Sequence, residues 1–519
     1  MNEALPRTGT GITMSGMRPV GGEMATSCVD GTTSGCQVVW PGGRRSMDLG
    51  PLLRPFGVVA PRWSVPEYLA EKPAGPCFLV LTDAAMATQI GLHATSEAAF
   101  TAYRSATNRT WWEAWRRRPI YRAVLPHLTF SGPGLEPIWV NDTGRAVAAW
   151  WGSGASRVLV MGLDIEAEIV RYRQGNPERV GTKVDRAAWG FQWERPNYLF
   201  DGQVDPLAPS VPWADRLGFF VAERWAELSG QPLLEPLPGG AKGLVVVTGD
   251  DDQAYLEKYA EQRELLGTTP MTYFLHPLTR HKGETLAQMG AQVDLGLHPD
   301  ALECPDDYDA RCREQTAWIE ELCGKKVRLV RNHGFLNRGY LGHVPVWEEA
   351  GLDLDVNYPG VDGTALTGSF LPMRVRRLDG TWSTHYSLLT AFGDGMIYAL
   401  NMSEWEAVRR IRRVVREIEN GQPGVLVFNL HPQNVADTKR IHAEVVRLST
   451  RPGWRAVGLA RYLEWLGHRD SLRFEPAFGQ GTDSLDPGAS DLVCRQWTTS
   501  GWKRFALAAG SVDSGGRGH

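Results

Sequence analysis

The sequence predicts an α/β protein whose second half is a barrel or sheet of parallel strands. Short apolar runs alternate with helix-like segments, and polar residues close several of the runs. Strands are expected at residues 245–247, 271–276, 293–298, 327–331 and 424–431, and helices at 253–266, 283–289, 310–323 and 404–419. Because the carboxyl ends of barrel strands converge on one face, the polar residues at these ends should lie close together.

The helix expected at 404–419 has the clearest pattern. Ser403 and Glu406 have the spacing of a capping box, and Asn420 and Gly421 end the segment. One face is apolar and consists of Trp405, Val408, Ile411, Val414, Val415 and Ile418. The opposite face carries five arginines, which we interpret as a solvated surface.

Composition divides the chain into four parts. Residues 1–48 are rich in Gly, Ser, Thr and Met and are expected to form a disordered arm. Residues 49–240 contain apolar runs at 77–82 and 156–162 and a short helical pattern at 110–118, which predict an N-terminal α/β accessory domain. The linker-like sequence PLPGG at 236–240 precedes the barrel, expected at 241–468, and residues 469–519 should form a loosely ordered tail.

Charge and composition exclude several classes of partner. The net charge of -4 does not favour nucleic acid, and we expect none as a partner. Seven cysteines lack paired metal-site spacing and are interpreted as reduced thiols. No apolar run approaches the roughly 18 residues of a membrane span, so we expect a cytoplasmic protein. Oligomeric state is left open.

The sequence VVVTGDDD at residues 245–252 places three carboxylates at the end of an apolar run. Neighbouring like charges are costly unless a cation is present, and such a group suits a metal ligand beside a base. Three histidines, His298, His333 and His431, also follow apolar runs. One histidine at a strand end is usually structural, but three near carboxylates favour a hydrolytic metal site.

In their order along residues 242–466, these motifs resemble those of the polysaccharide deacetylase family, carbohydrate esterase family 4. The resemblance implies a distorted (β/α) barrel and the removal of acetyl groups from N-acetylated sugars with a divalent metal. It also implies that Asp250 is the catalytic base and Asp251 a metal ligand. His298 matches the first histidine of the family's second motif, but Leu302 stands where the second ligand is expected.

We expect His333 to take the vacant ligand position, because the ends of adjacent strands lie roughly 5 Å apart. His276, at the end of another strand, is the alternative. One carboxylate and two imidazoles suit zinc best, although other divalent ions remain open.

Three further roles follow from the resemblance. Arg331 matches the family arginine that orients the base through an aspartate, and Asp355 is the match for that aspartate. His431 matches the general acid. On local grounds, Asp252 is interpreted as the cap of the following helix and Asp394 as a turn residue.

The resulting hypothesis is a metal-dependent hydrolase that removes an N-acetyl group from an amino sugar or polysaccharide precursor. Its partner would be an acetylated sugar or glycan. Two alternatives remain open: an inactive barrel that binds a glycan or a protein, and another metal-dependent C–N hydrolase. The accessory domain could shape the substrate cleft, mediate dimerisation or house a separate activity.

Overall fold

The structure is a computed structural model that describes residues 37–40, 62–64, 77–106, 119–152, 158–182, 193–229, 232–252, 254–471, 492–498 and 501–506. The helix predicted at 110–118 and most of the arm predicted at 1–48 lie outside these ranges.

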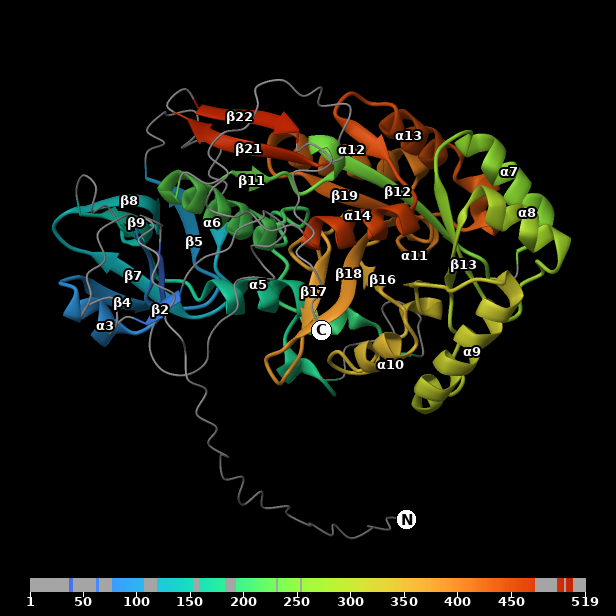
Figure 1. The fold of residues 1–519 in the computed structure, drawn as a ribbon, viewed down its shortest axis with the longest axis horizontal. Coiled ribbons are helices and arrows are strands. Elements are labelled where there is room, and N and C mark those ends of the chain that lie inside the picture. The colour runs from blue at the N-terminus through green and yellow to red at the C-terminus, as the bar shows by residue number, and fades with distance from the viewer. Residues whose placement is uncertain are drawn as a thin grey trace, which may run out of the picture. The chain divides into compact units, whose positions relative to one another are not determined.

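Seven parallel strands close into a barrel, one of the two arrangements that the residue pattern left open (Figure 1). The strands at residues 354–359 and 382–393 were not predicted. Each of the seven pairs with the next, and the last pairs with the first. In spatial order they are β12 (Gly243–Asp250), β13 (Met271–Leu275), β14 (Asp294–Leu297), β15 (Leu329–Val330), β16 (Leu354–Pro359), β18 (Trp382–Gly393) and β19 (Gly424–Asn429). Outside the ring, β17 (Met373–Arg376) runs antiparallel to β18, and β20 (Trp454–Ala456) pairs with the start of β12.

Side chains of β12 alternate between two apolar clusters. Leu244 and Val246 pack in one cluster with residues of α14 (Leu459–Ser471). Val245 and Val247 pack in the other, which contains the apolar faces of the surrounding helices. Because successive residues of a strand point to opposite faces, β12 has one face inside the barrel and one beneath its helices. This alternation decides which of the residues at the end of β12 reach the barrel mouth.

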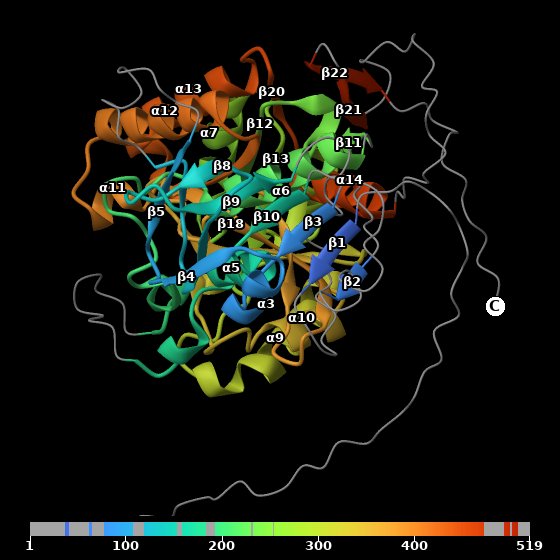
Figure 2. The ribbon, with the colours of Figure 1, turned by 90° about the vertical axis from the view of Figure 1, so that its left-hand side faces the viewer.

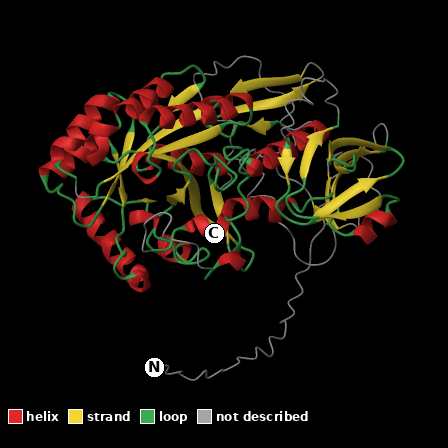
Figure 3. Ribbon diagram, turned by 180° about the vertical axis from the view of Figure 1, so that it is seen from behind, coloured by secondary structure: helices red, strands yellow, loops and turns green. Residues whose placement is uncertain are grey.

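Helices lie outside the barrel strands (Figure 3). In chain order they are α7 (Leu256–Leu266), α8 (Glu284–Gln292), α9 (Tyr308–Cys323), α10 (Val344–Glu349), α11 (Met396–Ala399), α12 (Glu404–Asn420), α13 (Lys439–Ser449) and α14. The capping prediction for α12 is confirmed, since Ser403 Oγ accepts the Glu406 N–H at 3.3 Å.

The surface of α12 differs from its prediction in two places. Trp405 is 58% exposed, and the Arg440 guanidinium lies 4.2 Å from its ring centroid. Arg412 makes a two-pronged ion pair with Glu444 of α13, which lies beside α12 (Figure 2). The basic face is therefore partly an interface between helices.

The N-terminal part forms a mixed sheet with the order β2-β1-β3-β10-β9-β8-β5-β6, and β4 and β7 branch from it. Its strands are β1 (Gln37–Trp40), β2 (Arg62–Ser64), β3 (Cys77–Val80), β4 (His93–Glu97), β5 (Ala102–Ser105), β6 (Tyr121–Arg122), β7 (His127–Ser131), β8 (Leu135–Val140), β9 (Ala146–Trp151) and β10 (Val158–Met161). Pairing is parallel from β2 to β10 and antiparallel beyond. The short helix α3 (Ala84–Gln89) follows β3.

Two longer helices complete this part, α5 (Ile165–Gln174) and α6 (Trp213–Ser229). Asp215 of α6 accepts hydrogen bonds from Arg173 Nη2 at 2.9 Å, Ser369 Oγ at 2.6 Å and Phe370 N at 2.7 Å. One buried carboxylate thus ties α5 and α6 to the segment before β17. The domain boundary expected between residues 240 and 241 stays a prediction.

The expected loose tail contains ordered structure in its described residues. Strands β21 (Val493–Thr498) and β22 (Gly501–Ala506) form an antiparallel hairpin, and β21 also pairs with β11 (Leu233–Leu234). Cys494 is fully buried there. Strand β11 offers an edge for the backbone hydrogen bonds of this hairpin.

Candidate active site

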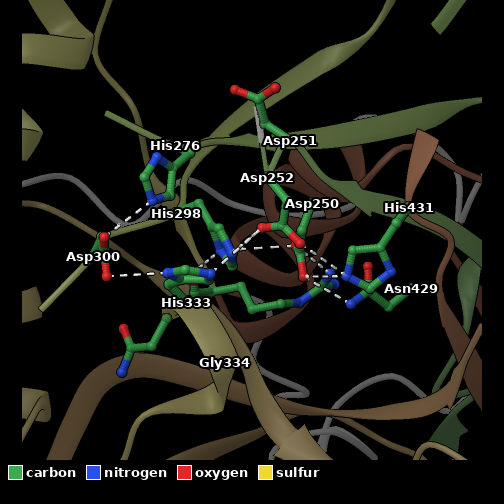
Figure 4. A network of polar contacts seen from close by, with 12 residues as sticks. Asp250, Asp251, Asp252, His276, His298, Asp300, His333, Gly334, Asn429 and His431 are labelled. Carbon is green, nitrogen blue, oxygen red and sulfur yellow. Dashed lines mark hydrogen bonds and ion pairs between the residues drawn. The ribbon is translucent and has the colours of Figure 1, made fainter. Parts of the chain in front are cut away.

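The structure brings the predicted strand-end residues to one end of the barrel (Figure 4). Asp250 ends β12, His276 follows β13, His298 follows β14, His333 lies in the 3₁₀ turn η8 (His333–Phe335) after β15, Asp394 follows β18 and His431 follows β19.

Asp250 lies inside the barrel mouth and is 3% exposed. Its Oδ1 accepts a hydrogen bond from Arg331 Nη1 at 2.8 Å, and its Oδ2 accepts one from Asn429 Nδ2 at 2.8 Å. Burial alone would raise the pKa of Asp250, but Arg331, His298 and His431 hold it well below its usual range. The carboxylate is therefore ionised and fixed in direction, and its lowered pKa limits its basicity.

The partner predicted for Arg331 is corrected by the structure. Arg331 pairs directly with Asp250 and also donates to Thr248 Oγ1. Asp355 instead accepts from His385 Nε2 at 2.9 Å and from the backbone N–H of Asn357. Asp355 lies in register with Val330, one residue before Arg331. Because adjacent residues alternate in direction, Asp355 faces the helices while Arg331 faces the barrel interior.

His431 is held by Asp394, a residue that sequence reasoning assigned to a turn. The Asp394 carboxylate is fully buried and accepts His431 Nδ1–H at 2.5 Å and the His431 backbone N–H at 2.7 Å. The other ring nitrogen, Nε2, faces Asp250 Oδ2 at 3.5 Å. Burial would lower the pKa of His431, but Asp394 and Asp250 raise it well above its ordinary value. The signal for Asp394 was its position at the end of the largely apolar segment LLTAFG at residues 388–393.

The second position of the acidic motif also requires a correction. The Asp251 carboxylate points away from the histidines (Figure 4) and accepts a hydrogen bond from Tyr259 of α7. The Asp252 carboxylate occupies the position expected for Asp251: its Oδ1 lies 3.3 Å from His298 Nε2 and 3.8 Å from His333 Nε2. Asp250, at the end of β12, points inward and Asp251 outward, as the alternation of a strand requires, and Asp252 is directed back toward the histidines by the turn that follows the strand.

The capping role expected for Asp252 is wrong as well. Helix α7 begins at Leu256, its cap residue is Tyr255, and no side chain caps its first turn. Asp252 itself has a φ of 37°, an uncommon backbone conformation for a residue other than glycine. The run of three aspartates marked the site, but the linear pattern gave no signal for the turn that directs Asp252 toward the histidines.

Asp252, His298 and His333 form a donor set that fits a divalent cation. Their ligand atoms lie within 4.8 Å of one another. His298 Nδ1 donates to the Arg331 carbonyl oxygen at 2.6 Å, which leaves the lone pair of Nε2 directed toward Asp252. Asp252 Oδ1 is buried and has no hydrogen-bond donor among the described residues. A cation between one carboxylate and two imidazoles would satisfy this oxygen.

His276 and Asp300 form a second group beside the first. Asp300 Oδ2 lies 3.2 Å from His276 Nε2, and Asp300 Oδ1 lies 3.0 Å from His333 Nδ1. These two histidines hold the pKa of Asp300 well below its usual range. Asp300 was not predicted, although it follows His298 by two residues on the same strand end. His276, Asp300 and His333 also meet the geometric condition for a cation group.

Comparisons with known proteins give structural similarities at low identity. A protein designated a polysaccharide deacetylase from Mycobacterium smegmatis matches with 14% identity and a TM-score of 0.36, covering 47% of this chain and 96% of its own. The allantoinase Puue matches with 14% identity and a TM-score of 0.37, and the match covers 47% of this chain and 96% of the allantoinase. A variant of the peptidoglycan deacetylase PdaC from Bacillus subtilis matches with 15% identity and a TM-score of 0.30, covering 45% and 95%.

No family model and no curated protein matches this chain. The function is therefore argued from the geometry of the site. Within the described ranges, no helix combines the length and apolar composition that crossing a bilayer requires.

Proposed function

We propose that the protein is a metal-dependent hydrolase that removes an N-acetyl group from an amino sugar or polysaccharide precursor. One observation carries the proposal: a buried carboxylate and an imidazole stand 3.5 Å apart beside a three-residue cation site. The pair is Asp250 with His431, and the cation site consists of Asp252, His298 and His333.

Zinc is the cation that best suits one carboxylate and two imidazoles. When bound, it would polarise the substrate carbonyl and lower the pKa of a bound water. His298 contributes Nε2, because Nδ1 is engaged by the Arg331 carbonyl. Asp252 contributes its unsatisfied Oδ1. The assignment differs from the sequence prediction in one ligand, with Asp252 in place of Asp251.

Amide hydrolysis needs a base that takes a proton from water and an acid that protonates the departing nitrogen. Asp250 is suited to be the base, because Arg331 and Asn429 fix both of its oxygens. His431 is suited to be the acid, because Asp394 binds Nδ1 and keeps the ring charged with Nε2 toward the site. The two roles are assigned to groups whose surroundings push their pKa values in opposite directions.

The motif order along the chain supports an N-acetylated sugar as the substrate. Two measurements test the whole assignment: the divalent metal content of the purified protein, and acetate release from a panel of N-acetylated amino sugars and their oligosaccharides. Allantoin in the same panel tests the alternative of another C–N hydrolase. About one ion per chain together with acetate release is expected. Metal binding without turnover of any panel member would favour a barrel that binds but does not hydrolyse.

A matched variant tests the base. Asp250→Asn keeps the shape of the side chain but removes its ability to accept the proton, so turnover should fall by roughly 10²- to 10⁴-fold. Its metal content should stay at the parent level, because Asp250 is not among the three expected ligands. Unchanged turnover would overturn the assignment of the base.

A further inference from the structure

We propose that Asp300 is a positioning residue for the metal site, which holds the His333 ring so that Nε2 faces Asp252 and His298. The inference rests on the proposed function, since it concerns how one ligand of that metal is directed. It also assigns His276 as a support for Asp300 and excludes it as a ligand.

The hydrogen bond between His333 and Asp300 fixes the tautomer of the His333 ring. Asp300 Oδ1 lies 3.0 Å from His333 Nδ1, and an ionised carboxylate can only accept, so Nδ1 carries the proton. In the neutral ring, Nε2 is then left with its lone pair, 3.8 Å from Asp252 Oδ1. A histidine that donates one nitrogen to a carboxylate and offers the other to a metal is held in direction and made more basic.

His333 needs such support because of its local structure. It lies in the short 3₁₀ turn η8 rather than within a strand, and its side chain is 29% exposed. His298, in contrast, is 1% exposed and is already directed by the Arg331 carbonyl. Without a partner at Nδ1, the His333 ring could turn toward solvent and lose its alignment with the other two ligands.

Asp300 is itself fixed from two sides. Gln315 of α9 accepts the Asp300 backbone N–H at 2.8 Å and donates to the Asp300 carbonyl at 2.9 Å. The backbone N–H of Leu302 donates to Asp300 Oδ1 at 3.2 Å. The carboxylate therefore has a defined position from which to direct His333.

The hydrogen bonds of His276 show that it donates to Asp300. The backbone N–H of Leu278 donates to His276 Nδ1 at 3.1 Å, so Nδ1 carries the lone pair. In the neutral ring the proton is then on Nε2, which faces Asp300 Oδ2 at 3.2 Å. A metal at Nε2 would force the proton onto Nδ1, where it would oppose the Leu278 N–H. His276 is consequently a donor in this network, and His333 is the third ligand.

The experiment measures the affinity and stoichiometry of cobalt(II) and its visible absorption spectrum in full-length variants. Asp300→Asn should bind one ion with affinity reduced by roughly 10- to 100-fold. His333→Ala should lose the parent spectrum. His276→Ala should weaken binding less than Asp300→Asn, and His276→Gln, which keeps a donor for Asp300, should recover much of that loss. Glu303→Gln, which removes an exposed charge from the same loop, is the control and should bind as the parent does.

Each other outcome is decisive. If Asp300→Asn binds cobalt as tightly as the parent, the positioning role is wrong while the proposed metal site stands. If both His276→Ala and His276→Gln lose the ion and its spectrum as fully as His333→Ala, His276 is a ligand and the inference is overturned. If the parent protein binds no divalent ion, both the proposed function and this inference are wrong. Circular dichroism of each variant separates these results from unfolding.

Discussion

The Asp394 carboxylate binds His431 twice, through the ring Nδ1–H at 2.5 Å and through the backbone N–H at 2.7 Å. The contact to Nδ1 favours the charged form of the His431 ring, and the contact to the backbone N–H fixes the main chain of His431. Together they direct Nε2 toward Asp250. A fully buried aspartate that a sequence motif does not identify thus determines the acidity of the expected general acid.

Replacing Asp394 should change the pH dependence of activity. Asp394 raises the pKa of His431, so Asp394→Asn should lower that pKa and reduce the charged fraction of the ring at neutral pH. Since the acid must be protonated to act, the alkaline limb of the kcat profile should move to lower pH, and kcat at neutral pH should fall by roughly 10²-fold. Steady-state kinetics across the pH range measure both effects.

The control for this prediction is Asp437→Asn, which removes an exposed carboxylate that bonds to Tyr398 at 2.9 Å. Its pH profile should match the parent. An Asp394→Asn variant that loses activity equally at every pH would indicate a structural role for Asp394 without control of the His431 charge.

Asp251 and Asp252 should differ in their effect on metal binding. Asp252→Asn removes the charged ligand that faces both imidazoles, so the variant should lose most of its bound metal. Asp251→Asn should keep the metal, because its carboxylate faces Tyr259 on the helix side of the barrel. It should instead lower the melting temperature, since it weakens a buried charged hydrogen bond worth about 1–3 kcal/mol. Elemental analysis and thermal unfolding of both variants give the answer, and the reverse order of metal loss would restore Asp251 as the ligand.

Glu168 should make stability depend on pH independently of the active site. Burial raises its pKa to about 7, although the backbone N–H groups of Val124 and Leu125 and the Tyr121 hydroxyl all donate to it. The folded carboxyl therefore binds its proton more tightly than the unfolded one, whose ordinary pKa is 4.5. Its contribution to the free energy of unfolding should fall by about 3 kcal/mol as pH rises from about 4.5 to about 7, and stay constant above.

The Glu168→Gln variant cannot titrate, so its melting temperature should change less steeply between pH 5 and pH 7 than that of the parent. Glu178→Gln, at an exposed position soon after the same helix, should follow the parent curve. Parallel curves for the parent and Glu168→Gln would show that Glu168 ionises in the folded protein near its ordinary pKa.

The parts of the site that the sequence predicted share one property. Asp250, His298, His333 and His431 each close an apolar run, and the end of a buried strand is a place that the linear pattern marks. The side-chain directions of the misassigned residues depend on more than their position along the chain. Asp251 directly follows β12 and Asp355 is the second residue of β16, and each faces the helices.

The sequence by itself determined the alternation of strands and helices, the strand ends that carry the site and the chemical types gathered there, because hydrophobic periodicity and strand-end polarity are local properties. Only the tertiary structure decided which carboxylate meets which imidazole. Closing the ring sets the register between strands, and the pleat then turns neighbouring residues to opposite faces. The turns and loops that follow these strand ends then place Asp252 beside His298, Asp394 beside His431 and Asp300 beside His333.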